Sequence, residues 1–294
     1  MSKEKMSAIQ KLVEENLPKI LPDKDKYNEP LVDAMAYSLL SGGKRLRPIL
    51  AIASCAAVGG NTDDALVSAC SIECIHAYSL IHDDLPGMDD DELRRGKPTN
   101  HIVYGVGMAT LAGDGLQAQA FENISNYWLD KKKPEIGLKV IKELAYGAGN
   151  NGMVVGQAQD LICEGKKIDK ENMQYIHAHK TGALITASVR IGAIIGNATD
   201  IQLDALTCYG KHIGLAFQIT DDILDVVGDT AVIGKPVGSD EKHEKATYPA
   251  MVGLEASKKL AEEQCSLAKE AIKDLPGDID VLNYIADYIL KRQK

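Results

Sequence analysis

The sequence predicts an all-α protein, a single large bundle of about 10–13 helices. Apolar residues recur at spacings of three and four through most of the chain, which is the period of an amphipathic helix. Long alternations of Val, Ile and Thr, which would indicate strands, are scarce. Glycine and proline gather between the periodic segments without forming a long polar linker. One domain over residues 1–294 is therefore expected.

The expected helices follow in order from the apolar period and its interruptions. Leu21-Pro22, Gly59-Gly60, Lys133-Pro134 and Gly196-Asn197 mark breaks because proline and glycine end helices. The segment 228–238 is a further break. The expected ranges are 5–18, 29–41, 46–58, 63–85, 108–129, 136–147, 150–163, 171–196, 201–227, 247–251, 255–273 and 277–291.

Two glycine-rich segments resemble nucleotide motifs but lack their context. Gly147-Ala-Gly149-Asn-Asn-Gly152 has the spacing of a dinucleotide fingerprint, yet the residues before it are helical and not a strand. It is interpreted as a corner between two helices. Gly42-Gly43-Lys44 lacks the first glycine and the Ser/Thr of a P-loop. Neither segment supports a nucleotide-binding enzyme.

Charge and cysteine content restrict the partners and the compartment. The chain has 42 acidic and 33 basic side chains, so its net charge of −9 argues against nucleic acid as a partner. Any bound phosphate must be met by local cations. The six cysteines lie mostly among apolar residues, which indicates buried thiols in a reducing cytoplasm and not a zinc site or a disulfide framework. The longest mainly apolar run, Pro48 to Gly60, is too short to span a bilayer, so no membrane insertion is expected.

A first acidic cluster closes the helix expected over 63–85. Six acidic residues lie within ten positions, from Asp83 to Glu92, and basic residues follow directly. Crowded carboxylates raise one another's pKa unless a cation lies between them. Ligation by carboxylates alone favours a hard ion such as Mg²⁺, completed by water and substrate phosphate. Because Pro86-Gly87 should interrupt the helix, Asp83 and Asp89 can turn toward one point.

A second acidic cluster lies at the end of the helix expected over 201–227. Asp221 and Asp225 stand at i and i+4, which places their carboxylates on one helix face roughly 6 Å apart along the axis. Either cluster alone could be a solvated helix end. Two clusters that each end an apolar helix predict opposing walls of one site for a diphosphate and about three Mg²⁺ ions.

These segments resemble the trans-isoprenyl diphosphate synthases, most closely the bacterial farnesyl diphosphate synthase kind. His82-Asp83-Asp84 through Thr99 is similar to the family's first aspartate-rich motif, in the form with four residues between aspartates, and Phe217 to Asp225 is similar to the second. The resemblance extends to the segments 42–48, 180–182 and 234–235, in the family's order. It implies a helical bundle around a central catalytic cavity, a homodimer, and a Mg²⁺-dependent prenyl transferase that joins isopentenyl diphosphate to dimethylallyl or geranyl diphosphate and makes farnesyl diphosphate.

The resemblance also implies roles at the first substrate. The implied metal ligands are Asp83, Asp84, Asp89, Asp221 and Asp225. The allylic diphosphate would be held by Arg94, Lys180, Lys235 and Lys245, because guanidinium and ammonium groups bind phosphate oxygens. The carbocation left by ionisation would be faced by the backbone carbonyl of Lys180, the Thr181 hydroxyl and the Gln218 amide oxygen.

The second substrate keeps its diphosphate and needs a separate cationic pocket without metal. The resemblance implies Lys44, Arg47, His76 and Arg95 for this pocket. Taken alone, the basic segment 44–47 could be a solvated helix start, and His76 could be a core histidine. Together with the two acidic clusters, the binding interpretation is preferred.

Product length should depend on what closes an apolar tunnel below the first cluster. Tyr78 lies five residues before Asp83, and in this family an aromatic residue there resembles a floor that stops growth near fifteen carbons. A plain core tyrosine is an equal alternative. Other interpretations are a geranylgeranyl diphosphate synthase, a terpene cyclase, which would need no second diphosphate pocket, and a non-catalytic subunit, which should have lost one cluster.

Overall fold

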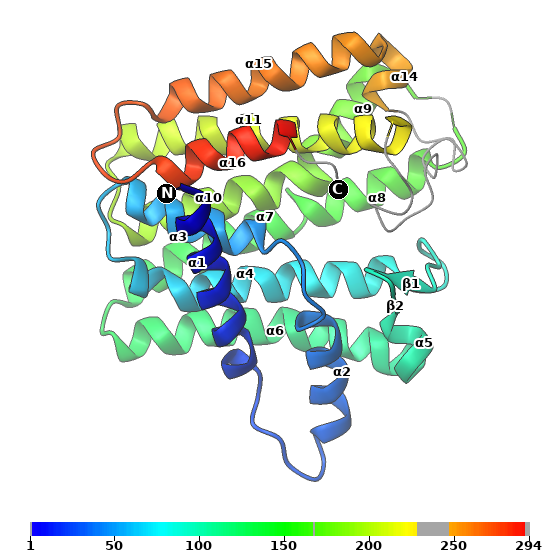
Figure 1. Cartoon of the computed structure of the whole chain (residues 1–294). Helices are drawn as coiled ribbons and strands as arrows, with labels where there is room; N and C mark the ends of the chain where they lie inside the picture. Colours follow the sequence, from blue (N-terminus) through cyan, green and yellow to red (C-terminus); the bar gives the residue numbers. More distant parts are fainter. Residues whose placement is uncertain (1, 167, 228–246, 292–294) are drawn as a thin grey trace.

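One long helix ends at the first residue of the first acidic cluster, another carries the second cluster near its end, and both helices end on the same side of the bundle (Figure 1). The computed structural model describes residues 2–166, 168–227 and 247–291. The described elements are α1 (Ser2–Asn16), η1 (Leu17–Ile20), α2 (Glu29–Leu39), α3 (Leu46–Ala57), α4 (Thr62–Asp83), β1 (Leu93–Arg94), β2 (Lys97–Pro98), α5 (Asn100–Tyr104), α6 (Val106–Asp130), α7 (Pro134–Ala148), α8 (Met153–Cys163), α9 (Lys170–Ile176), η2 (His177–Gly182), α10 (Ala183–Ile195), α11 (Asp200–Val227), α14 (Tyr248–Val252), α15 (Leu254–Ile272) and α16 (Asp280–Lys291). The carboxyl ends of α4 and α11 both lie at the end of the bundle that carries β1, β2 and α14. The all-α prediction is confirmed.

Local signals in the sequence explain where α4 begins and ends. The Asn61 side chain accepts a hydrogen bond from the backbone N–H of Asp63, which satisfies one free donor of the first turn. Asp63 and Asp64 also place negative charge at the positive end of the helix dipole. The helix ends at Asp83, shortly before Pro86 and the left-handed Gly87. The sequence predicted this helix within about two residues at each end.

The core lies between layers of packed helices. Helix α10 contacts α3, α7 and α11, while α4 packs on α6 and α3, and α11 packs on α15. Helix α4 is long and apolar enough to span a membrane, but 67% of its apolar window is buried inside the fold. It is therefore a core helix. Cys70 and Cys74 are fully buried on α4, and burial raises the pKa of Cys70 to about 12, as expected for apolar thiols.

The structure departs from the predicted helices at three places. The helix predicted over 171–196 consists of α9, a six-residue π-helical turn η2, and α10. In these six residues each turn contains more than the 3.6 residues of an α-helix, but the segment is too short for this change in period to be seen in a sequence. The antiparallel pair β1–β2 and the short helix α5 were also not predicted. The corner predicted at 147–152 is confirmed, because α7 ends at Ala148 and α8 begins at Met153.

Candidate active site

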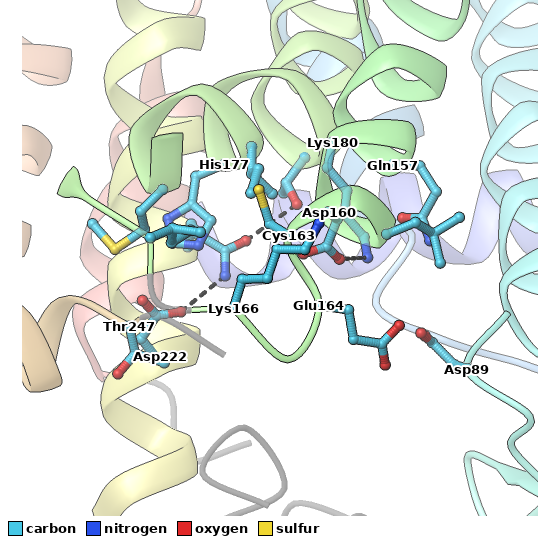
Figure 2. Close-up of a pocket in the computed structure, with 16 residues that line it drawn as sticks. Asp89, Gln157, Asp160, Cys163, Glu164, Lys166, His177, Lys180, Asp222 and Thr247 are labelled. Atoms are coloured by element: carbon cyan, nitrogen blue, oxygen red, sulfur yellow. Dashed lines mark hydrogen bonds and ion pairs between the residues drawn. The ribbon is translucent and has the colours of Figure 1, made fainter. Parts of the chain in front are cut away.

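A cavity of about 140 Å³ opens where α8, η2 and α11 meet the loop after α4. Asp89 from the first acidic cluster contributes to its wall, as do Gln218 and Asp222 from the second. Figure 2 shows Asp89 and Asp222 on opposite sides of this cavity. Two segments more than a hundred positions apart in the sequence therefore border one space.

Lys180 enters the cavity from η2 and is held by Asp160 of α8 (Figure 2). Its Nζ donates a hydrogen bond to Asp160 Oδ2 at 2.6 Å. Burial acts to lower the pKa of Lys180, but the carboxylates of Asp160 and Asp83 raise it overall, so the ammonium stays charged. A phosphate oxygen can replace the Asp160 carboxylate as the hydrogen-bond acceptor. Lys180 is thus a cation suited to an incoming anion.

The π-helical turn η2 lies directly against α8 at Gly156. A Cβ at Gly156 would lie 2.1 Å from the backbone nitrogen of Lys180, closer than any real contact. Only glycine allows this approach, because it has no side chain. Single turns of the π type within α-helices are frequent at functional sites. Here the turn carries both Lys180 and Thr181 to the cavity wall.

A hydrogen-bonded chain fixes the opposite wall. Thr181 Oγ1 donates to Gln218 Oε1 at 3.1 Å, and Gln218 Nε2 donates to Asp222 Oδ1 at 2.9 Å. The second Asp222 oxygen accepts from the backbone N–H of Tyr248 at 2.9 Å. Asp222 is 2% exposed, so this buried carboxylate orients the Gln218 amide and sets which end faces Thr181.

The carboxylates near the cavity fit a divalent ion with oxygen ligands. Burial raises the pKa of Asp83 to about 6, against the opposing charge of Lys180, and Asp89 and Asp84 add to the increase. A cation bound between such groups relieves their repulsion. Among the residues that the structure describes, no three metal-binding side chains are already gathered at ligand distance. Mg²⁺ is usually held by one or two carboxylates together with substrate phosphates, so the donor set fits Mg²⁺ that binds with a diphosphate.

A second, smaller pocket of about 30 Å³ lies between α2, α4 and the β1–β2 turn. It brings together His76, Arg94 and Arg95 of the predicted residues, with Arg45 and Glu73 beside them. Burial and the charges of surrounding arginines hold the pKa of His76 well below its usual value. His76 is therefore neutral, and the positive charge of this pocket comes from arginine.

Arg94 and Asp84 form a bidentate pair at the border of this second pocket. Arg94 Nε lies 2.8 Å from both Asp84 carboxylate oxygens. Asp84 is 3% exposed and lines the second pocket, while it is not among the residues that line the first cavity. The structure therefore places these two predicted residues, an allylic diphosphate ligand and a metal ligand, against each other.

The other predicted residues take varied positions. Asp221 is exposed on α11, and its charge raises the pKa of Arg47 against the stronger lowering by burial. Asp225 is half-buried one turn further along α11, and Lys44 is half-buried just before α3. Tyr78 is 5% exposed, with its ring centroid 5.7 Å from that of His82 in an edge contact, and it lines neither of the two pockets described above. Lys235 and Lys245 lie outside the described residues.

Sequence reasoning missed Asp160, Asp222 and Glu73. Asp160 and Asp222 line the cavity beside Lys180 and Gln218. The signal for Asp160 was a group of three polar residues, Gln157, Gln159 and Asp160, within an otherwise apolar helix. Asp222 lies inside the second cluster, but the sequence does not show that it is buried. Its burial in the structure is what distinguishes a carboxylate that supports Gln218 from one that could bind a metal ion. No sequence pattern marked Glu73.

Comparisons with known proteins point to one family. The family model described as polyprenyl synthetase matches residues 28–289. The chain is 48% identical over 262 residues to farnesyl diphosphate synthase of Geobacillus stearothermophilus, which covers 89% of this chain and 88% of that protein. It is 46% identical over 284 residues to geranylgeranyl diphosphate synthase of Cyanophora paradoxa, covering 96% and 93%. The crystal structure of geranylgeranyl pyrophosphate synthetase from Pyrococcus horikoshii matches with a TM-score of 0.87 at 33% identity, over 99% of both chains.

Proposed function

The chain belongs to the polyprenyl synthetase family, and from this membership we propose that it is a Mg²⁺-dependent prenyl transferase whose product is farnesyl diphosphate. The substrates would be isopentenyl diphosphate and an allylic diphosphate, either dimethylallyl or geranyl diphosphate. The observation that carries the proposal is the pairing of one cavity bordered by both acidic clusters with a separate arginine-rich pocket. The allylic substrate loses its diphosphate during the reaction and isopentenyl diphosphate keeps its own. The two diphosphates therefore need two separate sites.

The allylic diphosphate would lie in the first cavity. Its C–O bond breaks there, and both electrons of the bond leave with the diphosphate. Lys180 would bind that group by exchanging Asp160 for a phosphate oxygen, and Arg94 would turn part of its guanidinium from Asp84. Lys235 and Lys245 remain further candidates outside the described residues.

The metal would be held by the acidic residues around the same cavity. Asp83 and Asp89 are the proposed ligands on one side, with Asp84 a further candidate, and Asp221 and Asp225 on the other. When bound, Mg²⁺ neutralises charge on the departing diphosphate. The carboxylates would hold the ions in position before the reaction begins, so little reorganisation would be needed as charge develops.

The allylic cation would face uncharged oxygen atoms. The Thr181 hydroxyl, the Gln218 amide oxygen and the Lys180 carbonyl are the proposed groups, and the chain through Asp222 keeps Gln218 from turning. The double bond of isopentenyl diphosphate attacks the cation and forms one C–C bond. The new cation then loses a proton to the released diphosphate in the same cavity, so no protein base is required.

The second pocket would hold isopentenyl diphosphate without metal. The proposed cations are Arg95, which lines this pocket, and Lys44 and Arg47, which lie just before α3 and in its first turn and are not among the lining residues. Neutral His76 would be a hydrogen-bond donor. Binding there places the double bond beside the allylic carbon, and this alignment accounts for a large part of the acceleration.

The length of the product is the part of the proposal for which there is a specific alternative. The relatives named above include a farnesyl and a geranylgeranyl diphosphate synthase at 48% and 46% identity, so a geranylgeranyl diphosphate synthase is the second candidate. Tyr78 favours the fifteen-carbon product, because a buried aromatic ring five residues before Asp83 would limit the depth available to the growing chain.

Replacing Tyr78 with alanine should shift the product mixture from fifteen toward twenty carbons. The smaller side chain removes a ring that is 5% exposed and leaves a cavity that a longer chain could occupy. Products are extracted and separated by chain length by chromatography. Tyr78→Phe retains the ring and should keep the original mixture. An unchanged mixture in a folded Tyr78→Ala protein would remove Tyr78 from this role.

Purified protein incubated with radiolabelled isopentenyl diphosphate and each allylic substrate tests the function. Label should enter a lipid of fifteen carbons when Mg²⁺ is present and should not enter when the metal is chelated. Incorporation into a twenty-carbon product as the main species would favour the second candidate. No incorporation from any allylic substrate would contradict the enzyme and favour a non-catalytic subunit.

The proposal includes a homodimer located in the cytoplasm. Support for association comes from apolar side chains exposed along α5 and the start of α6. Ile102, Val103, Val106 and Leu111 are each 46–55% exposed and lie within ten positions. Light scattering of the purified protein would measure the mass directly.

A further inference from the structure

Arg45 adopts a backbone conformation that is costly for a residue with a side chain. Its φ of 50° and ψ of 33° lie in the left-handed region, immediately before α3. Outliers of this kind persist when surrounding contacts hold them in place. The turn at Arg45 separates Lys44 from Arg47, so its conformation sets the directions in which these two cations leave the chain.

The Arg45 side chain supplies the contacts that hold this turn. Its Nη1 donates to Glu73 Oε1 at 2.8 Å, and its Nη2 donates to the Leu39 carbonyl at 3.0 Å. The Arg45 and Glu73 side chains are only 2% and 3% exposed. One guanidinium thus ties the end of α2 and the start of α3 to the middle of α4.

Glu73 also shapes the charge of the second pocket. Two carboxylates line that pocket, and each is paired with one arginine, Asp84 with Arg94 and Glu73 with Arg45. Arg95 instead donates to the Gly42 carbonyl and to Ser41 Oγ. Within the described chain it has no carboxylate partner, so its charge is left for an anion.

The position of Glu73 lets it support its neighbours at the same time. It lies one helical turn before His76 on α4. Burial lowers the pKa values of Arg47 and Arg95, and the charge of Glu73 opposes that decrease in both. Its second oxygen, Oε2, is buried without a hydrogen-bond partner among the described residues. The charge of Glu73 therefore supports the charged forms of Arg47 and Arg95, while its hydrogen bond goes to Arg45.

We propose that Arg45 and Glu73 are positioning residues for the second diphosphate pocket. The inference rests on the proposed function, because it assumes that isopentenyl diphosphate binds there. The pair would act by fixing the turn between Lys44 and Arg47, because its two side chains border the pocket but are almost fully buried. A buried ion pair contributes little net stability when compared with apolar residues of similar size, whereas loss of one partner leaves a buried charge. The effect on substrate binding and the effect on folding can therefore be separated.

The test compares a double variant with single variants. Arg45→Met with Glu73→Leu removes both charges together and should fold, whereas either single change leaves one buried charge. In the double variant we expect the KM for isopentenyl diphosphate to rise at least tenfold, while the KM for the allylic substrate stays within twofold. Arg45→Lys keeps the charge but loses the fork, so it should restore part of the affinity. Arg45→Gly removes both the strain of the left-handed backbone and the guanidinium. This variant should still bind isopentenyl diphosphate weakly, because the side-chain contacts are lost.

A second ion pair, which is bidentate and less buried, provides a control outside the two pockets. Arg190 Nε and Nη2 donate to the two Glu143 oxygens at 2.7 and 2.8 Å, between α10 and α7. Neither residue lines the cavity or the second pocket. Arg190→Met with Glu143→Leu should leave both KM values unchanged, whatever its effect on the melting temperature.

Calorimetry in the presence of a chelator adds a readout besides activity. Isopentenyl diphosphate should bind the wild type without metal, and the double variant should bind it at least tenfold more weakly. Equal binding by the wild type and a folded double variant would overturn the inference while the proposed function stands. No binding and no prenyl transfer by the wild type would overturn the proposed function, and the inference with it. An equal rise in both KM values would show general loss of the fold and contradict a role specific to this pocket.

Discussion

Asp83→Asn is expected to lower kcat by about 10²–10³-fold and to raise the Mg²⁺ concentration needed for half-maximal activity. The change removes one carboxylate charge and keeps the shape of the side chain. Asp83 lies where burial and nearby aspartates already raise its pKa to about 6, which is the signature of a carboxylate that needs a cation. Steady-state kinetics over a range of Mg²⁺ concentrations measures both effects.

The same substitution should stabilise the metal-free protein. The folded-state pKa of Asp83, about 6, lies above its unfolded value of 3.8, so this group's contribution to stability is lost as the pH rises from about 4 to about 6, and the charged carboxylate disfavours the folded state above that range. Asn cannot ionise, and the free energy of unfolding at pH 7.5 should rise by about 1–2 kcal/mol. For the wild type, lowering the pH through about 6 should increase the Mg²⁺ requirement, because protons then compete at Asp83. The Asn variant should lack this contribution.

Asp90→Asn is the matched control for the change in charge. Asp90 belongs to the same acidic cluster, but it is exposed and has a φ of 49°, a conformation that asparagine adopts readily. Its replacement should leave kcat and the Mg²⁺ requirement within about twofold. Equal losses in the Asp83 and Asp90 variants would show that only the total negative charge matters and would contradict a ligand role for Asp83.

Gly156→Ala is expected to lower kcat by about 10²-fold or more and to destabilise the protein by about 1–3 kcal/mol. The added Cβ would lie 2.1 Å from the Lys180 nitrogen and 2.7 Å from the carbonyl carbon of His179. Both atoms are backbone, so η2 must move away from α8 as a unit. Lys180 and Thr181 would move with it, away from the positions that face the cavity.

Gly107→Ala is the control for glycine replacement within a helix. Gly107 lies in α6, and a Cβ at this position would meet no atom within 4 Å. Alanine there should maintain kcat and increase the melting temperature slightly, since glycine is the poorer helix former. Kinetics and thermal melting of both variants, measured side by side, give the comparison. A Gly156→Ala protein with normal kcat would show that η2 can shift without consequence for Lys180.

The parts of this fold that could be predicted are those with a long apolar period or with local signals for the beginning and end of a helix. The range expected over 201–227 agrees with α11 within one residue at its start, because its apolar face repeats over many turns. The two-residue strands β1 and β2 could not be predicted, since they are too short to show alternation and depend on the β1–β2 turn. The π turn was missed because its register is set by contact with α8 at Gly156 and not by its own six residues.

The sequence determined which reactive and charged side chains this protein has, and the tertiary structure decided which of them lie together in one site. Acidic clusters, basic segments and helical periods are local properties, so they can be seen in the sequence. Partners such as Lys180 with Asp160, or Arg45 with Glu73, are joined across helices, and their distances depend on packing. Burial acts in the same way: Asp221 and Asp222 are adjacent and chemically identical, yet one is exposed and the other anchors Gln218. Their difference arises because a helix turns neighbouring side chains to different sides, and only the packed fold determines which side meets solvent.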